Sequence, residues 1–213
     1  MPICPIDTGR YGSPEMRRIF EEENRLQKFL DVEAAVAYAL AAVNMIPKEA
    51  AEEIGRKANV KYVKLARCKE IEKSIGHDLM AVVRALTEAC DPDAGKWVHY
   101  GLTSYDVEDS ATALQFKEAL EITKSDILEL ETTLLELADK HRDLIMAGRT
   151  HGQHMAVITL GLKFAVWMRE LARHRERLEE AKKRILVGKI VGRRRHRRWL
   201  RGSSARDSGD CFR

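Results

Sequence analysis

From Leu102 to Ala147 the chain contains neither glycine nor proline. Apolar residues recur along this stretch at alternating spacings of three and four, and a second such series runs from Val157 to Ile185. This periodicity is typical of long amphipathic helices that pack along a seam, and helices of about 30–40 residues reach about 45–60 Å. A hairpin of two such helices cannot bury both seams on itself, so we expect further helices or further subunits to cover them.

The sequence before these stretches also predicts helices. "SPEM" marks a helix start, with Ser13 as the N-cap and proline in the first turn, and that helix should run to about Asn44. "PKEAAEEIGRKA" predicts a short second helix. Helical sequence follows Asn59 until Gly76 breaks it, and "HDLMAVVRALTEAC" resumes helix until Asp91. No segment alternates with a period of two for long, so we expect no strand.

These patterns predict an all-α chain in two parts. Residues 1–100 should form a small N-terminal helical domain, and residues 101–191 the first long helices of a helical bundle. Residues 192–213 differ, because they contain 8 arginines, no lysine and 2 aspartates, whereas the preceding sequence mixes 15 lysines with 14 arginines. The helical period also stops there. We interpret 192–213 as an aberrant tail, either disordered or read out of frame, and it accounts for the positive net charge of +4.

Several classes of protein are disfavoured. No apolar run approaches the ~20 residues that span a bilayer, and "MPICPIDTGRYG" has no secretory signal pattern. The four cysteines are scattered without a C-x-x-C pair, which disfavours a disulfide framework and a zinc site. We therefore expect a cytoplasmic protein without membrane contact.

Three polar breaks interrupt the helical pattern: "SIGHDLM" (Ser74–Met80), "HYGLTSYDVED" (His99–Asp109) and "GRTHGQHM" (Gly148–Met155). The third break raises a question, because Asn-Gly or Asp-Gly would turn the chain between two helices without any histidine. His151-x-x-His154 suggests a metal, but neither a cysteine nor an H-E-x-x-H pattern supports it. The imidazoles therefore either cap and pack, or the turn carries chemistry.

The first two breaks also have a structural interpretation. Asp78 can cap the helix that follows it, with His77 beside the free N–H groups. Thr103 and Asp106 have the spacing of a capping box. That arrangement leaves Ser104 and backbone N–H groups at the start of the longest helix, where carboxylates and phosphates bind readily.

Four segments together resemble one family. "GLTSYDVEDSA" and "GRTHGQHMAVITLG" resemble two signature regions of the fumarase/aspartase superfamily, and "RYGSPEM" with "GHD" narrows the resemblance to the adenylosuccinate lyases. It covers about residues 1–191. The resemblance implies β-elimination of fumarate from adenylosuccinate, giving AMP, and from SAICAR, giving AICAR, in purine biosynthesis. It also implies no metal or organic cofactor, and a homotetramer with shared sites.

The resemblance also implies roles for single residues. His151 is the general acid that protonates the leaving nitrogen, and His77 supports it and contacts a substrate phosphate or carboxylate. Gly76 departs from the family, since many members carry a basic residue there. Met155–Ile158 replaces the more usual Ala-x-Pro-Thr. The substrate-binding residues implied are Arg10, Tyr11, Gly76, Asp78, Thr103, Ser104, Thr150 and Gln153.

The resemblance stops near Val191, whereas family members continue with sequence that includes the loop bearing the catalytic base. We therefore expect the 213-residue chain to be a truncated, inactive form. The alternative is a protein of another class: a non-catalytic helical scaffold that forms oligomers, or a nucleic-acid binder that uses the arginine-rich tail. The tail has no groove-reading motif, so we expect no nucleic-acid partner.

Overall fold

A computed structural model describes residues 11–191 of the 213. Arg10 and the tail 192–213, on which two of the predictions fall, lie outside the described residues. The chain divides into two compact units, one made of Met1–Phe116 with Leu186–Arg213 and the other of Lys117–Ile185. Each is described by itself. Helix α7 (Ser104–Lys140) passes from the first unit into the second, and the predicted domain boundary near residue 100 stays a prediction.

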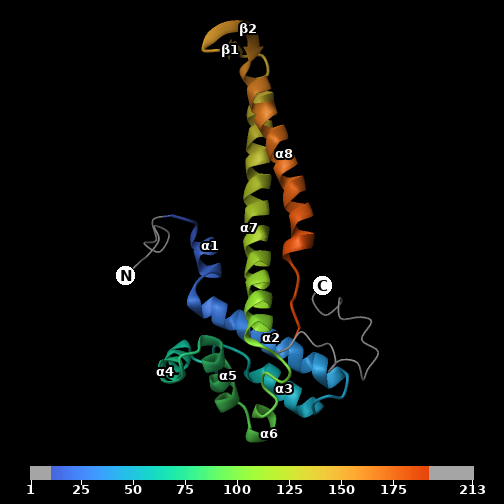
Figure 1. The fold of residues 1–213 in the computed structure, drawn as a ribbon. Coiled ribbons are helices and arrows are strands. Elements are labelled where there is room, and N and C mark those ends of the chain that lie inside the picture. The colour runs from blue at the N-terminus through green and yellow to red at the C-terminus, as the bar shows by residue number, and fades with distance from the viewer. Residues whose placement is uncertain (1–10, 192–213) are drawn as a thin grey trace. The chain divides into compact units, whose positions relative to one another are not determined.

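The described part of the first unit is helical (Figure 1). Its core is formed by side chains such as Leu30, Ile54, Leu79 and Leu86, each 0–1% exposed. No described helix has the length and apolar character needed to cross a membrane. Besides the start of α7, the helices of the first unit are α1 (Pro14–Ile19), α2 (Glu22–Ala42), α3 (Lys48–Lys57), α4 (Leu65–Ile75), α5 (Asp78–Ala89) and α6 (Pro92–Gly95).

The prediction of a single helix from Ser13 to Asn44 is wrong in one respect, because the helix is broken at Phe20 into α1 and α2. Ser13 does cap α1 as predicted, since its hydroxyl accepts a hydrogen bond from Met16 N–H. At the break, the carbonyl of Ile19 accepts side-chain hydrogen bonds from Asn24 and Gln115. These amides replace the helical partner that Ile19 loses. Glu21 then precedes α2 as its N-cap, and Glu22 and Glu23 occupy the first turn, where the helix dipole favours negative charge.

The helix predicted directly after Asn59 begins later, at Leu65. Asn59 instead turns the chain, because its side-chain oxygen accepts a hydrogen bond from Lys61 N–H. Gln27 holds the next segment by accepting from Val60 N–H. The short helices predicted at 47–58 and 77–90 are confirmed as α3 and α5.

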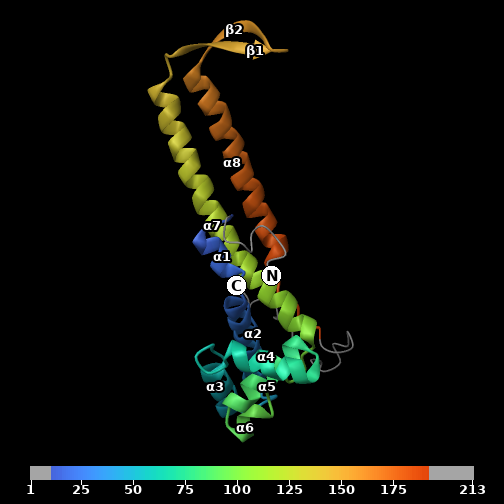
Figure 2. The same ribbon diagram turned by 90° about the vertical axis from the view of Figure 1, so that its left-hand side faces the viewer.

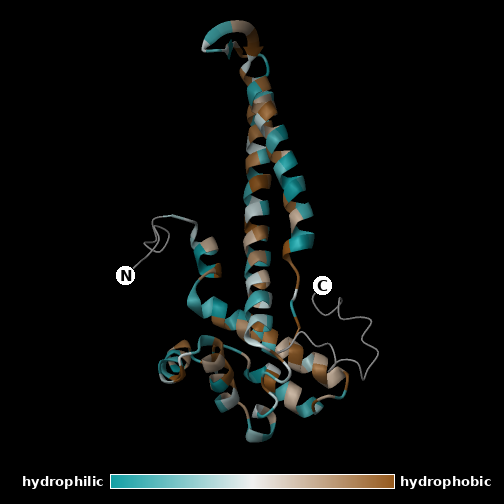
Figure 3. Cartoon of the chain, in the orientation of Figure 1, coloured by the Kyte–Doolittle hydropathy of each residue, from teal (hydrophilic) through white to brown (hydrophobic). Residues whose placement is uncertain are grey.

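The second unit is the distal part of α7, a two-stranded sheet, and α8 (Leu160–Ile185). Helices α7 and α8 run side by side in both views (Figures 1 and 2), and the ion pairs Arg175–Glu131 and Lys124–Glu179 join them. Apolar and polar segments alternate along both helices (Figure 3). The predicted long helices are thus confirmed.

Two strands form where the sequence predicted helix and turn. β1 (Ile145–Thr150) pairs antiparallel with β2 (Gln153–Thr159), in a register that places Ile145 opposite Thr159. α7 accordingly ends at Lys140 rather than near Ala147. Most of the hairpin is exposed and therefore lacks the alternation of apolar and polar residues that marks a half-buried strand. Apart from this small sheet, the predicted helical fold class is confirmed.

Candidate functional site

The break between α4 and α5 presents an imidazole at a helix start. Gly76 ends α4 in the left-handed conformation, with φ of 66°, which favours glycine. His77 then caps α5, because its Nδ1 accepts a hydrogen bond from Met80 N–H at 3.4 Å. The predicted cap, Asp78, is instead the first residue of the helix, and its carboxylate lies 4.0 Å from Arg25. The capping prediction was wrong in that the histidine, not the aspartate, makes the bond.

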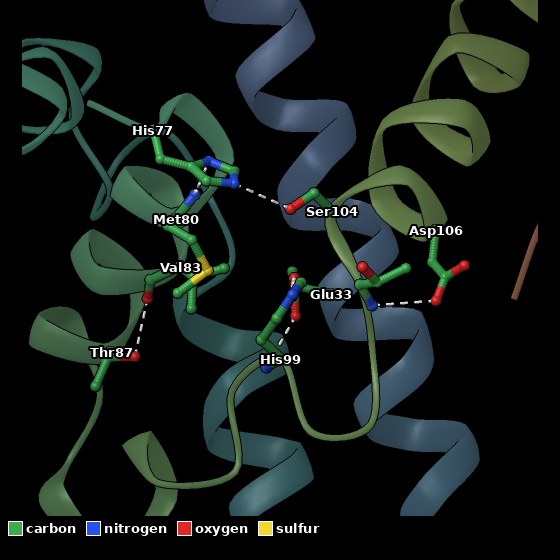
Figure 4. A network of polar contacts seen from close by, with 9 residues as sticks. Glu33, His77, Met80, Val83, Thr87, His99, Ser104 and Asp106 are labelled. Atoms are coloured by element: carbon green, nitrogen blue, oxygen red, sulfur yellow. Dashed lines mark hydrogen bonds and ion pairs between the residues drawn. The ribbon is translucent and has the colours of Figure 1, made fainter. Parts of the chain in front are cut away.

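The other ring nitrogen of His77 faces the start of α7 (Figure 4). Nε2 lies 3.4 Å from the hydroxyl oxygen of Ser104. In the tautomer that leaves Nδ1 free to accept from Met80 N–H, Nε2 carries the ring hydrogen and donates toward Ser104. Nδ1 also lies 3.5 Å from Oδ1 of Asp78. The imidazole is exposed. Two residues that the sequence predicted as site residues are therefore brought together from segments 27 positions apart.

Half of the predicted capping box at the start of α7 forms, because the Asp106 side chain accepts from Thr103 N–H, whereas Asp106 N–H is bound by the Thr103 carbonyl rather than by its hydroxyl. Thr103 N–H donates to Oδ2 of Asp106 at 3.1 Å, and Asp106 N–H donates to the Thr103 carbonyl at 2.9 Å. Asp106 is fully buried. Its other oxygen, Oδ1, accepts a hydrogen bond from Val191 N–H at 3.0 Å. The aspartate thus fixes both the helix start and the last described stretch of the chain.

Charged side chains surround this part of the first unit. Burial and the nearby carboxylate of Asp78 raise the pKa of the Glu108 carboxyl, while Arg25 and His77 act in the opposite direction.

Tyr11, predicted to bind phosphate, is 63% exposed. Within the described residues, no group of three His, Cys, Asp or Glu side chains lies close enough together to hold a metal ion.

The remaining predicted residues lie in the second unit, at the tip of the β1–β2 hairpin. Thr150 and Gln153 are cross-strand partners, and His151 and Gly152 form the two-residue turn between them. Both turn residues have positive φ, 50° for His151 and 74° for Gly152. This is the pattern of a type I′ turn, which favours Asn-Gly because the left-handed region penalises a Cβ. A histidine at the first position carries a Cβ into this left-handed region, where residues other than glycine are uncommon, and this motivates the hypothesis that the residue has a functional role.

The neighbouring histidine is placed differently. His154 lies in β2 opposite Arg149, and a bulge leaves Met155 without a partner residue. Both His151 and His154 are exposed. The two imidazoles therefore share a segment and a degree of exposure, but only His151 occupies the left-handed turn.

A lyase family profile matches residues 9–194 of the chain. The chain belongs to this lyase family. It is 53% identical over 192 residues to an adenylosuccinate lyase of Methanocaldococcus jannaschii and 56% identical over 192 residues to one of Pyrococcus abyssi. Each alignment covers 90% of this chain, but only 41% and 42% of the relatives. The chain therefore spans about two fifths of the length of the curated relatives it matches.

A solved structure shows the same fold. The fumarate lyase of Mesorhizobium sp. BNC1 matches this chain with a TM-score of 0.80 and 34% sequence identity. The match covers 86% of this chain and 44% of that chain.

Sequence reasoning did not find one polar pair of this chain. Glu33, in the middle of α2, accepts hydrogen bonds from both the backbone N–H and the ring Nδ1 of His99, at 3.1 and 2.6 Å (Figure 4). The glutamate is 2% exposed. A local signal did exist, because charged residues are almost never fully buried without a partner and Glu33 falls among apolar core positions of α2. Its partner, 66 residues away, had no such signal.

Proposed function

We propose that the chain is part of an adenylosuccinate lyase, a carbon–nitrogen lyase that eliminates fumarate from adenylosuccinate and from SAICAR in purine biosynthesis. One observation carries the proposal: the chain is 53% and 56% identical to two adenylosuccinate lyases over 192 of its 213 residues. The substrates are small molecules, and the enzyme acts in the cytoplasm.

The elimination requires removal of a proton beside a carboxylate and protonation of the leaving purine nitrogen. His151 is the general acid, because an imidazole gives up a proton at modest cost near neutral pH. Its position in a strained, exposed turn supports this role. Thr150 and Gln153, which flank the turn as cross-strand partners, orient the substrate beside it.

The first unit binds the substrate. Ser104, with the Nε2–H group of His77, receives a carboxylate of the succinyl group, and Thr103 and Asp78 border this contact. Hydrogen-bond donors fixed at a helix start stabilise negative charge as it grows in the transition state. Arg10 and Tyr11 hold the nucleotide phosphate. Gly76 gives the chain its turn into His77, where other family members add a basic contact.

The exposed apolar side chains of α7 and α8 support assembly of the enzyme as a homotetramer whose sites are shared between subunits. Among them are Leu130 at 47%, Leu135 at 56% and Trp167 at 45% exposed. Such side chains on a long helical hairpin are covered when subunits associate.

The test is a chimera in which residues 1–191 replace the matching region of the Pyrococcus abyssi relative. The chimera should release fumarate from adenylosuccinate, measured by ultraviolet absorbance. His151→Ala should lower its turnover by about 100-fold or more, as expected for a lost general acid, while substrate still binds.

His154→Ala is the matched control, because it removes another exposed imidazole three residues away and should leave turnover close to that of the parent. A folded chimera with no fumarate release would reject the proposed function. Equal turnover for the two alanine variants would reject His151 as the acid.

A further inference from the structure

The loop between α6 and α7, residues 96–103, is held at two points by buried carboxylates. We propose that Glu33 and Asp106 are positioning residues, which fix this loop so that the Ser104 hydroxyl meets His77. The proposal deepens the proposed function, because it rests on Ser104 and His77 receiving a substrate carboxylate. Both carboxylates come from outside the loop, Glu33 from α2 and Asp106 from within α7.

Glu33 holds the loop at His99. Its Oε2 accepts from His99 N–H at 3.1 Å, and its Oε1 lies 2.6 Å from Nδ1 of the same residue. His99 has φ of 61°, a left-handed conformation that is unfavourable for a residue with a Cβ. A glutamate that is 2% exposed is costly to bury unless its oxygens are paired. Here both oxygens are used on one residue, and they hold it in the conformation that the loop requires.

Asp106 holds the other end of the loop. An ordinary capping aspartate would accept only the Thr103 N–H, but this fully buried carboxylate also accepts from Val191 N–H at 3.0 Å. The segment 186–191 is fixed a second time, since Ser110 Oγ accepts from Lys189 N–H and donates to the Lys189 carbonyl, at 3.0 and 3.2 Å. The loop end is thus tied to a segment 85 residues away.

The two attachments lie on either side of three residues, 100–102. Leu102, at 8% exposed, anchors the interval in the core, while Gly101 turns the chain with φ of 77°. Ser104 follows directly, with its hydroxyl 3.4 Å from Nε2 of His77. A hydroxyl and an imidazole on separate helices act on one anion only if their spacing is set beforehand by supporting residues. The buried carboxylates provide that support.

The test is amide hydrogen exchange of the full 213-residue chain, followed by NMR. Glu33→Gln and Asp106→Asn preserve the shape of the side chain. Each replaces a carboxylate, in which both oxygens accept hydrogen bonds, by an amide, in which only the oxygen accepts. Loss of a hydrogen bond to a charged group predicts exchange about tenfold faster or more at His99 in the first variant and at Thr103 in the second. The ring ¹⁵N signal of Nε2 in His77 should shift in both.

The control is Gln115→Met, which removes a buried hydrogen bond to the Ile19 carbonyl in the same unit without touching the loop. It should lower global stability but leave the two loop amides and the His77 signal unchanged. Loop amides that exchange no faster in the carboxylate variants than in Gln115→Met would overturn the proposal. If a variant does not fold, hydrogen exchange in the wild-type chain tests the proposal instead. His99 and Thr103 amides that exchange as fast as amides of an unstructured loop would also overturn the proposal.

A second measurement separates this proposal from the proposed function. Titration of the wild-type chain with succinate should shift the Ser104 amide and the His77 ring signals, and Glu33→Gln should weaken that response. No response in the wild type, together with faster loop exchange in the variants, would count against the carboxylate site but leave Glu33 and Asp106 as positioning residues.

Discussion

His77 uses its two ring nitrogens for different purposes, one for the fold and one for the site. Nδ1 caps α5 through Met80 N–H, while Nε2 faces Ser104. Asparagine places an acceptor where Nδ1 lies, whereas glutamine places an amide near Nε2. The two tasks of the imidazole can therefore be separated by substitution.

We predict that His77→Asn keeps the stability of the chain, because asparagine is among the best N-caps, while His77→Gln loses about 1 kcal/mol. In the chimera the order should reverse, with substrate affinity reduced more by Asn than by Gln because only Gln retains a donor near Nε2. Urea unfolding and steady-state kinetics measure the two effects. Parallel losses of stability and affinity in both variants would show that the ring acts only as a cap.

Glu108 predicts a pH dependence of stability. Its pKa is raised by burial and by Asp78, so between the ordinary carboxylate pKa and this raised value the folded chain binds the proton more tightly than the unfolded chain. The free energy of unfolding therefore falls as the pH rises through that window.

We predict that Glu108→Gln stabilises the chain at neutral pH by up to about 1 kcal/mol, a value kept small because the side chain is partly solvated. The gain should disappear at a pH below the ordinary carboxylate range, where both states are protonated. Glu129→Gln, which removes an exposed carboxylate from the same helix, is the control and should change little. Urea unfolding at both pH values measures the difference, and a gain that persists in acid would contradict this electrostatic origin.

At the scale of elements, α8 begins against the end of α7 through a glycine. A Cβ on Gly161 would lie 2.4 Å from the Ala138 carbonyl oxygen and 2.6 Å from Arg142 Cα, so backbone would have to move. The close approach also permits Gly161 N–H to donate to the His141 carbonyl at 2.9 Å. This contact closes the hairpin at the point where both strands leave the helices.

We therefore predict that Gly161→Ala destabilises the second unit by about 1–3 kcal/mol, the usual range for overpacking. The neighbouring Leu162→Ala changes an exposed side chain on the same turn and should cost less. Urea unfolding followed by circular dichroism compares them. A Gly161→Ala variant as stable as the parent would show that the helices can separate there without penalty.

The elements differ in how far the sequence could predict them. The long helices were predictable because their periodic pattern extends over many turns without glycine or proline. The β1–β2 hairpin was not, because its strands are exposed and its turn carries His151 in place of asparagine. The sequence singled out His77 and His151 as site residues, and their roles stay predictions. The partners of the histidines were not predictable, since contacts such as Glu33 with His99 join distant segments that carry no shared local pattern.

For the whole molecule, the apolar residues that two helices cannot cover decide how chains associate. On α7, Leu134 is 8% exposed, whereas Leu128 and Leu135 are 41% and 56% exposed. The exposed pair is seven residues apart and so falls on one face of the helix. Burying such side chains between subunits releases about 25 cal/mol per Å² of apolar surface.

We predict that the 213-residue chain associates through this face, and that Leu128→Gln with Leu135→Gln shifts it toward monomer. Glu129→Gln with Glu136→Gln is the matched control, because it introduces the same residue at two exposed positions, also seven apart, on the adjacent face. Sedimentation velocity over a series of concentrations measures the assembly, and the leucine variant should need at least about tenfold more protein to associate, the ratio that corresponds to about 1.4 kcal/mol. Wild-type chain that sediments as a monomer at micromolar concentration would contradict the prediction. Equal dissociation of both double variants would show that Leu128 and Leu135 do not form the contact between chains.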